Sequence, residues 1–224
     1  MPRRLLVFDM DGVLVDVTES YREAIQQTVE HFSGVRPTRA RIQEIKNQGG
    51  WNDDWSLSHK LIGDAGVQVE FQQVVDYFQS IFHGDGSNGL ILRERWIARD
   101  GLFRRLAERC DFAVFTGRLK WEAEYTLRRF APDTVFDPII GMEEVRNLKP
   151  APDGLLLIRD LRPGAELYYV GDSIDDARCA RAAGVPFIGI ASPSNPRHEE
   201  LVRLHKAERA IAVIDDINGL EGVL

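Results

Sequence analysis

Two aspartates two residues apart follow a short apolar run near the start of the chain. Residues 5–8 have the length and composition of a buried strand, and Asp9, Asp11 and Gly12 come directly after them. Open α/β sheets bind their ligands at the carboxyl ends of strands. Two carboxylates at such a point can hold a hard divalent cation and divide nucleophile and acid roles between them. The alternative is an Asp-Gly turn that only ends the strand.

Three later segments place further reactive side chains after apolar runs or at a helix start. The run 112–115 ends in Thr116, which is followed by a glycine. Lys149 precedes a proline, which is a signal for the start of a helix. The run 168–170 leads through a glycine to Asp172, and Asp176 follows four residues later. A hydroxyl, an ammonium group and further carboxylates are groups that phosphoryl transfer uses.

These four segments, in this order, resemble the motifs of the haloacid dehalogenase superfamily of phosphotransferases, in its subfamily with a helical cap. The resemblance covers residues 1–15 and 93–224. It implies an α/β fold: a Rossmann-like parallel sheet with helices on both faces, forming the catalytic core. It also implies that residues 16–92, inserted after the first strand, form a small all-helical cap domain that closes over the site.

The resemblance implies a role for each motif residue. Asp9 would be the nucleophile that forms an aspartyl-phosphate, and Asp11 the acid that protonates the leaving alcohol and then the base that activates water. Thr116, Gly117 and Lys149 would bind the phosphoryl oxygens. Arg118 is a candidate phosphate or substrate contact, and equally a surface or hinge residue.

The same resemblance implies a Mg²⁺ cofactor, which lets an anionic nucleophile meet a phosphate dianion. Its ligands would be Asp9, the backbone carbonyl of Asp11, and Asp172. Asp176 belongs to the same acidic group and would orient a metal-bound water or Lys149.

The pattern of apolar residues changes near residue 93. Before it, periodicities predict helices over 18–32, from 38, before 63 and over 71–82, with no strand in 16–92. After it, helices at 95–109, 119–130, 152–160, 174–183 and 196–206 alternate with strands at 112–115, 135–136, 166–170, 186–190 and 210–214. Such alternation is typical of a parallel sheet covered on both faces.

The segment 49–55 is the predicted substrate-contacting loop of the cap. It holds Trp51, Asn52 and Asp53, followed by a second carboxylate and a second indole. Residues 16–92 contain eleven acidic residues and six Lys or Arg, which accounts for −5 of the net charge of −7. Acids and aromatic faces suit a cation, so we expect a phosphate ester with an amine or imidazole. Histidinol phosphate is one candidate, and the loop also resembles that of a subgroup linked to histidine biosynthesis. Alternatively, the tryptophans pack the cap and the acids cap a helix.

Composition narrows the class of protein and partner. A hydrophobic content of 44% over 224 residues is ordinary for a soluble globular protein. The net charge of −7 argues against a nucleic-acid partner, and no run reaches the about 20 apolar residues of a membrane span. Cys110 and Cys179 are unclustered, as packing residues in a reducing compartment are. We expect a cytoplasmic monomer or homodimer acting on a small phosphate ester.

Other functions remain open at this stage. A sugar phosphomutase would have the same core residues as a phosphatase. A haloacid dehalogenase would need neither the metal nor Asp11, and a phosphonate hydrolase would need a cap lysine. A non-catalytic binding protein on this fold is a further alternative, although Asp9, Lys149 and Asp172 are all present.

Overall fold

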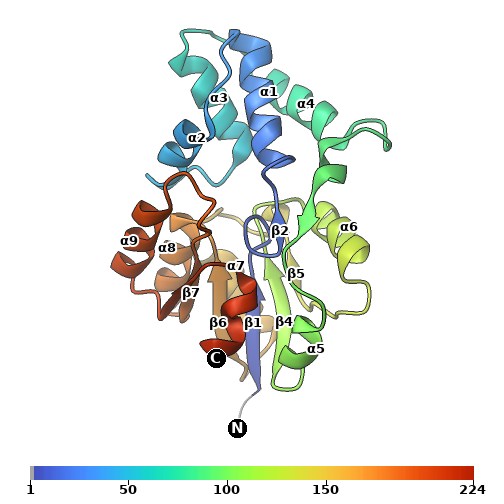
Figure 1. Ribbon diagram of the computed structural model, residues 1–224, viewed down its shortest axis with the longest axis vertical. Coiled ribbons are helices and arrows are strands. Elements are labelled where there is room, and N and C mark those ends of the chain that lie inside the picture. Colours follow the sequence, from blue (N-terminus) through green and yellow to red (C-terminus); the bar gives the residue numbers. More distant parts are fainter. Residues whose placement is uncertain (1–2) are drawn as a thin grey trace. The chain divides into compact units, whose positions relative to one another are not determined.

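The structure is a computed structural model that describes residues 3–224 (Figure 1). The chain divides into two compact units. One consists of the chain up to Val15 together with Trp96–Leu224, and the other of Asp16–Arg95. Within residues 3–224, no helix combines the length and apolar character that a bilayer crossing requires.

The larger unit is built on a six-stranded parallel sheet. Its spatial order is β5 (Ile139–Ile140), β4 (Cys110–Phe115), β1 (Arg4–Phe8), β6 (Glu166–Gly171), β7 (Phe187–Ile190) and β8 (Ala212–Ile214). The first strand in the sequence therefore lies in the middle of the sheet, between β4 and β6. The strand order changes direction beside β1, which is the kind of position where open α/β sheets bind ligands.

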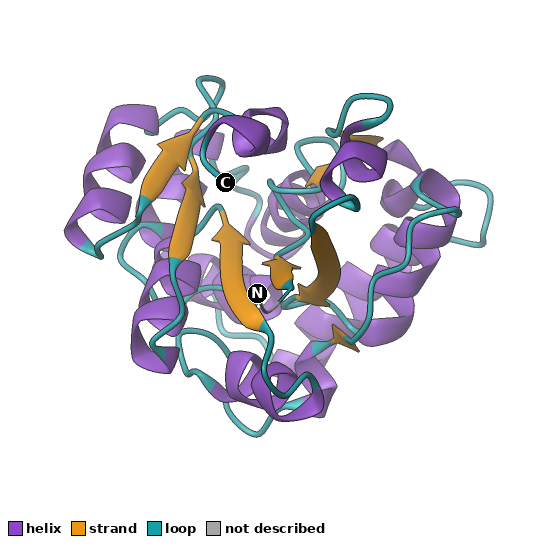
Figure 2. Cartoon of the chain, turned by 90° about the horizontal axis from the view of Figure 1, so that it is seen from below, coloured by secondary structure: helices purple, strands orange, loops and turns teal. Residues whose placement is uncertain are grey.

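Successive residues of β1 face opposite sides of the sheet, and both sides are buried. Leu5 and Val7 belong to a core that includes residues of α7 (Asp153–Leu161) and α8 (Ile174–Ala183). Phe8 belongs to an aromatic cluster on the other side, where its ring centroid lies 5.9 Å from that of Phe103 in α5 (Leu102–Leu106). Figure 2 shows helices on both faces of the sheet, which include α6 (Lys120–Phe130) and α9 (His198–Ala207). The predicted α/β core is confirmed.

The smaller unit lies entirely within the described residues and contains four α-helices. They are α1 (Tyr21–Ser33), α2 (Arg39–Lys46), α3 (Asp54–Asp64) and α4 (Phe71–His83). Tyr21 packs against Phe82, with ring centroids 4.1 Å apart, and both side chains are buried. Thr38 caps α2 by accepting a hydrogen bond from the backbone N–H of Arg41 at 3.1 Å, which explains why that helix begins there.

The prediction of a long helix over 95–109 is wrong. Arg95–Trp96 instead forms β3, which pairs with β2 (Val15–Asp16) where the chain leaves the core and returns to it. The expectation of no strand in 16–92 therefore fails at Asp16. Gly101 has φ 79°, so the helix begins only after it, at Leu102. A left-handed residue interrupts a right-handed helix.

The predicted strand at 135–136 is also wrong. Phe136 packs in the aromatic cluster, 5.3 Å from the ring of Phe103, while Val135 is 77% exposed. Hydrogen bonds to β4 begin at Asp137, whose N–H donates to the carbonyl of Phe112, and the carbonyl of Pro138 then accepts from the N–H of Val114 before β5 follows. Phe136 thus packs in the core and Val135 faces solvent, whereas Pro138, which lacks an N–H, can still offer a carbonyl to the ladder.

Candidate active site

The register of the central strands brings three polar segments to one edge of the sheet. Phe8, the last residue of β1, lies opposite Val114 of β4 and Val170 of β6. The N–H of Asp9 continues the ladder by donating to the carbonyl of Val170 at 2.9 Å. Because the strands are parallel, the residues that follow them gather at this edge. Asp9, Thr116 and Asp172 are therefore neighbours although more than fifty residues separate each from the next.

Lys149 lies between two carboxylates at this edge. Its Nζ is 3.0 Å from Oδ1 of Asp9 and 2.8 Å from Oδ1 of Asp176. Its side chain is 1% exposed, and the ammonium lies 4.8 Å from the ring centroid of Phe115. Burial lowers the pKa of Lys149, but the attraction of Asp176 and Asp9 outweighs it and raises that pKa above its ordinary value. The lysine is thus a fixed positive charge beside Asp9.

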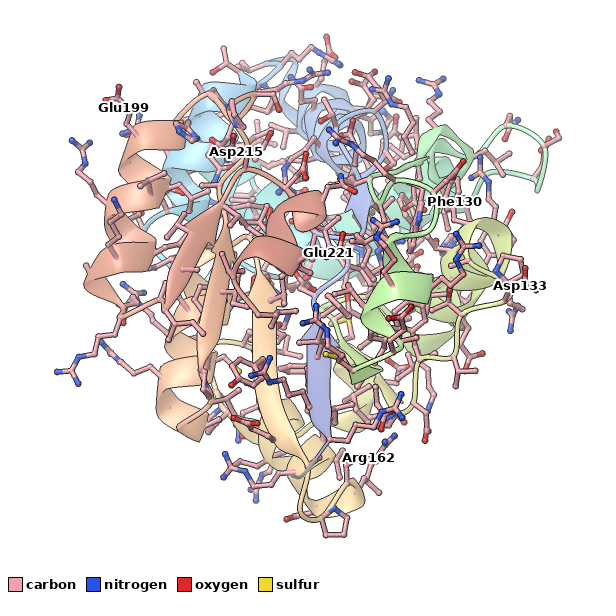
Figure 3. The ribbon with its side chains drawn as sticks, turned by 60° about the horizontal axis from the view of Figure 1, so that its bottom comes forward. Phe130, Asp133, Arg162, Glu199, Asp215 and Glu221 are labelled. Atoms are coloured by element: carbon pink, nitrogen blue, oxygen red, sulfur yellow. The ribbon has the colours of Figure 1, made fainter. Side chains whose placement is uncertain are left out.

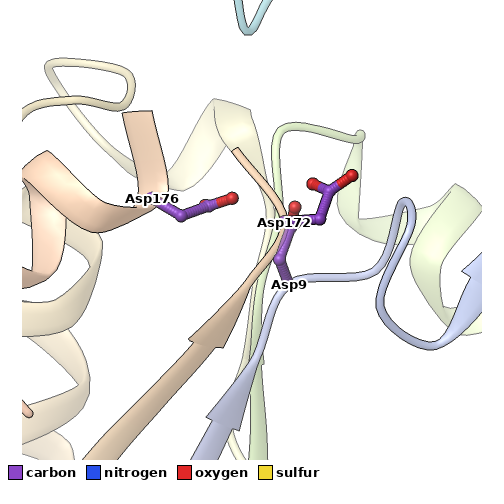
Figure 4. Close-up of side chains that lie close together, drawn as sticks. All are labelled: Asp9, Asp172 and Asp176. Carbon is purple, nitrogen blue, oxygen red and sulfur yellow. The ribbon is translucent and has the colours of Figure 1, made fainter. Parts of the chain in front are cut away.

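Asp176 has its oxygen atoms occupied by four donors. Oδ1 forms the ion pair with Lys149 and accepts a hydrogen bond from the hydroxyl of Tyr169 at 2.7 Å. Oδ2 accepts from the N–H and the hydroxyl of Ser173 at 3.0 and 2.6 Å. Burial raises the pKa of Asp176, but Lys149 and these hydrogen bonds more than compensate, and the pKa is lowered. Figure 4 shows its side chain pointing from α8 toward the strand ends. Asp176 therefore holds the ammonium of Lys149 in position.

The Asp9 carboxyl is buried among other charges. Burial raises its pKa to about 7, Asp176 and Asp11 act in the same direction, and Lys149 opposes them. A nucleophilic carboxylate must be ionised, so a positive charge in addition to Lys149 would be needed to hold Asp9 fully ionised near neutral pH.

The residues at this edge fit a hard divalent cation. Asp9, Asp172 and Asp176 each offer a carboxylate oxygen, and these atoms lie within 4.8 Å of one another (Figure 4). Because Asp176 already accepts three hydrogen bonds and pairs with Lys149, Asp9 and Asp172 are the two carboxylates best able to ligate. Oxygen-only donors are the set that Mg²⁺ prefers.

Thr116 and Asp11 converge on a buried arginine. Thr116 is 1% exposed, and its hydroxyl oxygen accepts from the N–H of Arg118 at 3.2 Å. The guanidinium Nε of Arg118 donates to Oδ1 of Asp11 at 2.6 Å. Its Nη1 donates to the hydroxyl of Thr126 in α6 at 3.2 Å. Gly117, between Thr116 and Arg118, is partly exposed. The sequence indicated each of these motif residues, but not that Arg118 would pair with Asp11.

The loop predicted to contact substrate lies in the smaller unit, and the two carboxylates of this loop have partners within that unit. Asp53 caps α3, where Oδ1 accepts from the N–H of Trp55 at 3.0 Å and Oδ2 from that of Ser56 at 3.3 Å. Asp54 forms an ion pair with Lys46. The alternative that these acids cap a helix therefore describes Asp53.

The indole and amide of the same loop are partly exposed. The ring centroid of Trp51 lies 5.6 Å from Nζ of Lys60, a cation–π contact. Asn52 is also partly exposed. A contact of Trp51, Asn52 or Asp53 with substrate stays a prediction.

Tyr169 is a site residue that sequence reasoning missed. Its side chain is fully buried, its hydroxyl donates to Asp176, and the ammonium of Lys149 lies 5.4 Å from its ring centroid. Burial, together with the charge of Asp176, raises its pKa well above the ordinary value, so it remains a hydrogen-bond donor. Its position inside an apolar strand predicts an ordinary core residue. The only signal for a role in the site is the alternation along the strand, which places Tyr169 on the side of the sheet that α8 covers.

Comparison with known proteins gives matches along most of the chain. Residues 6–190 match the family model described as haloacid dehalogenase-like hydrolase. A phosphorylated carbohydrates phosphatase of Thermotoga maritima is 26% identical over 95% of this chain and 98% of its own length. A putative haloacid dehalogenase-like hydrolase of Bacteroides fragilis superposes with a TM-score of 0.77 at 21% identity, covering 97% of this chain and 99% of the other.

A further relative is larger than this chain. It is named imidazoleglycerol-phosphate dehydratase, comes from Phytophthora nicotianae, and is 34% identical over 202 residues. The match includes 86% of this chain but only 44% of the relative, so the chain spans less than half of that protein's length.

Proposed function

The chain belongs to the haloacid dehalogenase-like hydrolases, and from that membership we propose that it is a Mg²⁺-dependent phosphomonoesterase with Asp9 as its nucleophile. The observation that supports this most is the position of Lys149, whose ammonium lies 3.0 Å from the Asp9 carboxylate at the edge where Thr116 and Asp172 also lie. A phosphoryl group beside Asp9 would meet the ammonium of Lys149 and the hydroxyl of Thr116.

In the proposed reaction, a carboxylate oxygen of Asp9 attacks phosphorus and the bond from phosphorus to the ester oxygen breaks. Asp11 gives its proton to the departing oxygen, so the alcohol leaves neutral. Asp11 then takes a proton from water, whose oxygen attacks the aspartyl-phosphate and releases inorganic phosphate and the Asp9 carboxylate. Lys149 neutralises charge on the phosphoryl oxygens in both steps.

Mg²⁺, held by Asp9, Asp172 and the backbone carbonyl of Asp11, would supply the further positive charge that brings two anions together. This ligand set follows the family resemblance and fits the oxygen cluster at the strand ends. Asp176 acts on this site through Lys149.

We further propose that the alcohol portion of the substrate has an imidazole or amine, as in histidinol phosphate. Support comes from the Phytophthora relative, which is named for a phosphate ester of an imidazole compound, and from the partly exposed Trp51 ring. The loop carboxylates give less support, because Asp53 caps α3 and Asp54 pairs with Lys46.

A panel of phosphate esters tests both parts of the proposal. Histidinol phosphate, phosphoglycolate and glucose 6-phosphate would be compared at equal concentration, with and without Mg²⁺, using the wild type and Asp9→Asn. We expect Mg²⁺-dependent phosphate release that Asp9→Asn abolishes, with the highest kcat/KM on histidinol phosphate. Preference for phosphoglycolate or the sugar phosphate would overturn the imidazole proposal alone. Isomerisation of glucose 1-phosphate that needs a bisphosphate would identify a mutase and overturn the hydrolase proposal.

A further inference from the structure

The contact between Arg118 and Asp11 suggests a role for the arginine that the motif does not assign. Arg118 is only 2% exposed, yet its charge lies at the edge of the sheet that holds the proposed catalytic residues. Its Nε lies 2.6 Å from Oδ1 of Asp11, and its Nη2 forms an ion pair with the same oxygen atom. A buried arginine of this kind is costly unless its partners are fixed.

All three guanidinium nitrogens of Arg118 have protein partners. Nε and Nη2 contact Asp11, and Nη1 donates to Thr126 at 3.2 Å. The backbone N–H of Arg118 donates to the hydroxyl of Thr116. The guanidinium is thus directed toward the acid and α6, and not left available for a phosphate oxygen.

The two contacts on Oδ1 leave the other oxygen of Asp11 for proton transfer. A planar guanidinium that holds one carboxylate oxygen through two nitrogens restricts rotation of the carboxyl group. The Asp11 side chain is 24% exposed, whereas that of Arg118 is 1% exposed, so the acid and not the arginine is accessible from outside the core. An acid must lie within hydrogen-bond reach of the atom that it protonates, and small displacements cost large factors in rate.

We propose that Arg118 is a positioning residue that orients Asp11 for proton transfer to the leaving oxygen, and that it does not bind the phosphoryl group. This inference rests on the proposed phosphatase function. It concerns only the step in which the ester oxygen departs, where the proton moves from the free oxygen of Asp11 to that oxygen as its bond to phosphorus breaks.

The test compares two leaving groups. The alkoxide of an alkyl ester needs a proton, whereas p-nitrophenolate leaves without one, and kcat/KM reports the steps up to that departure. For Arg118→Lys we expect kcat/KM on the alkyl ester to fall by about 10²-fold, with little change on p-nitrophenyl phosphate. Asp11→Asn should show the same selectivity, and adding Arg118→Lys to it should cause little further loss.

Control variants separate positioning from folding. Arg162→Lys alters another arginine ion pair of the core, with Asp111 at 2.8 Å, and should leave the ratio of the two kcat/KM values unchanged. Figure 3 shows Arg162 at the end of the sheet where the strands begin, away from the site. If Arg118→Lys fails to fold, Thr126→Val keeps the guanidinium and removes one anchor, and it should lower the same ratio to a smaller extent.

Several results would overturn the proposal. An equal loss on both esters, together with weaker inhibition by inorganic phosphate, would show that Arg118 binds the phosphoryl group. An unchanged ratio in Arg118→Lys, or in Thr126→Val where that variant stands in, would show that the contact does not position Asp11. Absence of phosphate release by the wild type from either ester would instead refute the proposed function, and the positioning role with it.

Discussion

Gly12 lies directly against the side chain of Asp172. A Cβ atom at residue 12 would be only 2.0 Å from Oδ2 of Asp172, and Gly12 has φ 74°. The loop after β1 can therefore approach the end of β6 this closely only because residue 12 has no side chain. The glycine of the first motif thus helps to set the position of a carboxylate in the fourth.

Gly12→Ala should weaken Mg²⁺ binding, because the new methyl group must displace Asp172. We expect at least a tenfold higher Mg²⁺ requirement, in line with the effect of disturbing the support of a ligand, and lower activity at saturating metal. Gly184→Ala is the matched control, since Gly184 has φ 66° and nothing within 4 Å of its added Cβ. Both variants should lose about 1 kcal/mol of stability through backbone strain, but only Gly12→Ala should alter the metal titration. Equal metal titrations of the two variants would show that Gly12 does not set the position of Asp172.

Lys149 and Asp176 should both contribute strongly to stability, and their contributions should be coupled. Both side chains are at most 1% exposed, so removing either partner leaves the other a buried charge with fewer groups to compensate it. Lys149→Met and Asp176→Asn should each lower the free energy of unfolding by about 3–5 kcal/mol, and the double variant by less than the sum. Denaturant titrations of the wild type, the two single variants and the double variant measure these losses. Lys120→Met, which breaks an exposed pair with Glu144 at 2.8 Å, should change stability by less than about 1 kcal/mol. Additive losses at 149 and 176 would refute the coupling.

The metal-free protein should become less stable as pH rises toward neutrality, and Asp9 should be a cause. The pKa of Asp9 is about 7 in the folded chain and 3.8 for a free side chain. Between these pH values the folded state holds a proton on Asp9 that the unfolded state has released. The contribution of Asp9 to the free energy of unfolding is therefore complete below pH 3.8 and is lost as pH rises through about 7. From about pH 5 to about pH 8, the unfolding free energy of the wild type should therefore fall relative to that of Asp9→Asn. Denaturant titrations in chelator would measure it, and a constant difference would rule it out.

Asp53 should contribute to stability mainly as a helix cap. Its carboxylate accepts from two backbone N–H groups at the start of α3, so Asp53→Ala should cost about 1 kcal/mol. Asp53→Ser, which keeps a capping oxygen, should restore most of that stability. If capping is the whole role, KM in the serine variant will equal that of the wild type. A raised KM with normal thermal stability would show instead that Asp53 contacts the substrate.

The sequence was sufficient for the class of fold and for most of the residues at the strand ends. Apolar runs that end in Asp9, Thr116 and Asp172 indicate parallel strands with polar carboxyl ends, and the register of β1 then brings these residues together. Local pattern is enough here because every such strand ends at the same edge of the sheet.

Pairings between distant residues could not be read in this way. Arg118 lies 107 residues from Asp11, and no local signal distinguishes a buried arginine from one on the surface. Tyr169 reads as an ordinary strand residue until its hydroxyl is seen against Asp176. The helix predicted over 95–109 failed for a related reason, since the pairing of β3 with β2 and the left-handed Gly101 override its apolar periodicity.

Trapping the covalent intermediate tests most directly whether Asp9 is the nucleophile. Wild type and Asp9→Asn would be mixed with a radiolabelled phosphomonoester and Mg²⁺, quenched in acid during turnover, digested and mapped. We predict acid-stable label on the peptide that contains Asp9 in the wild type, and none in Asp9→Asn or when a chelator replaces Mg²⁺. Label on another residue, or undiminished phosphate release by Asp9→Asn, would contradict the claim that Asp9 is the nucleophile.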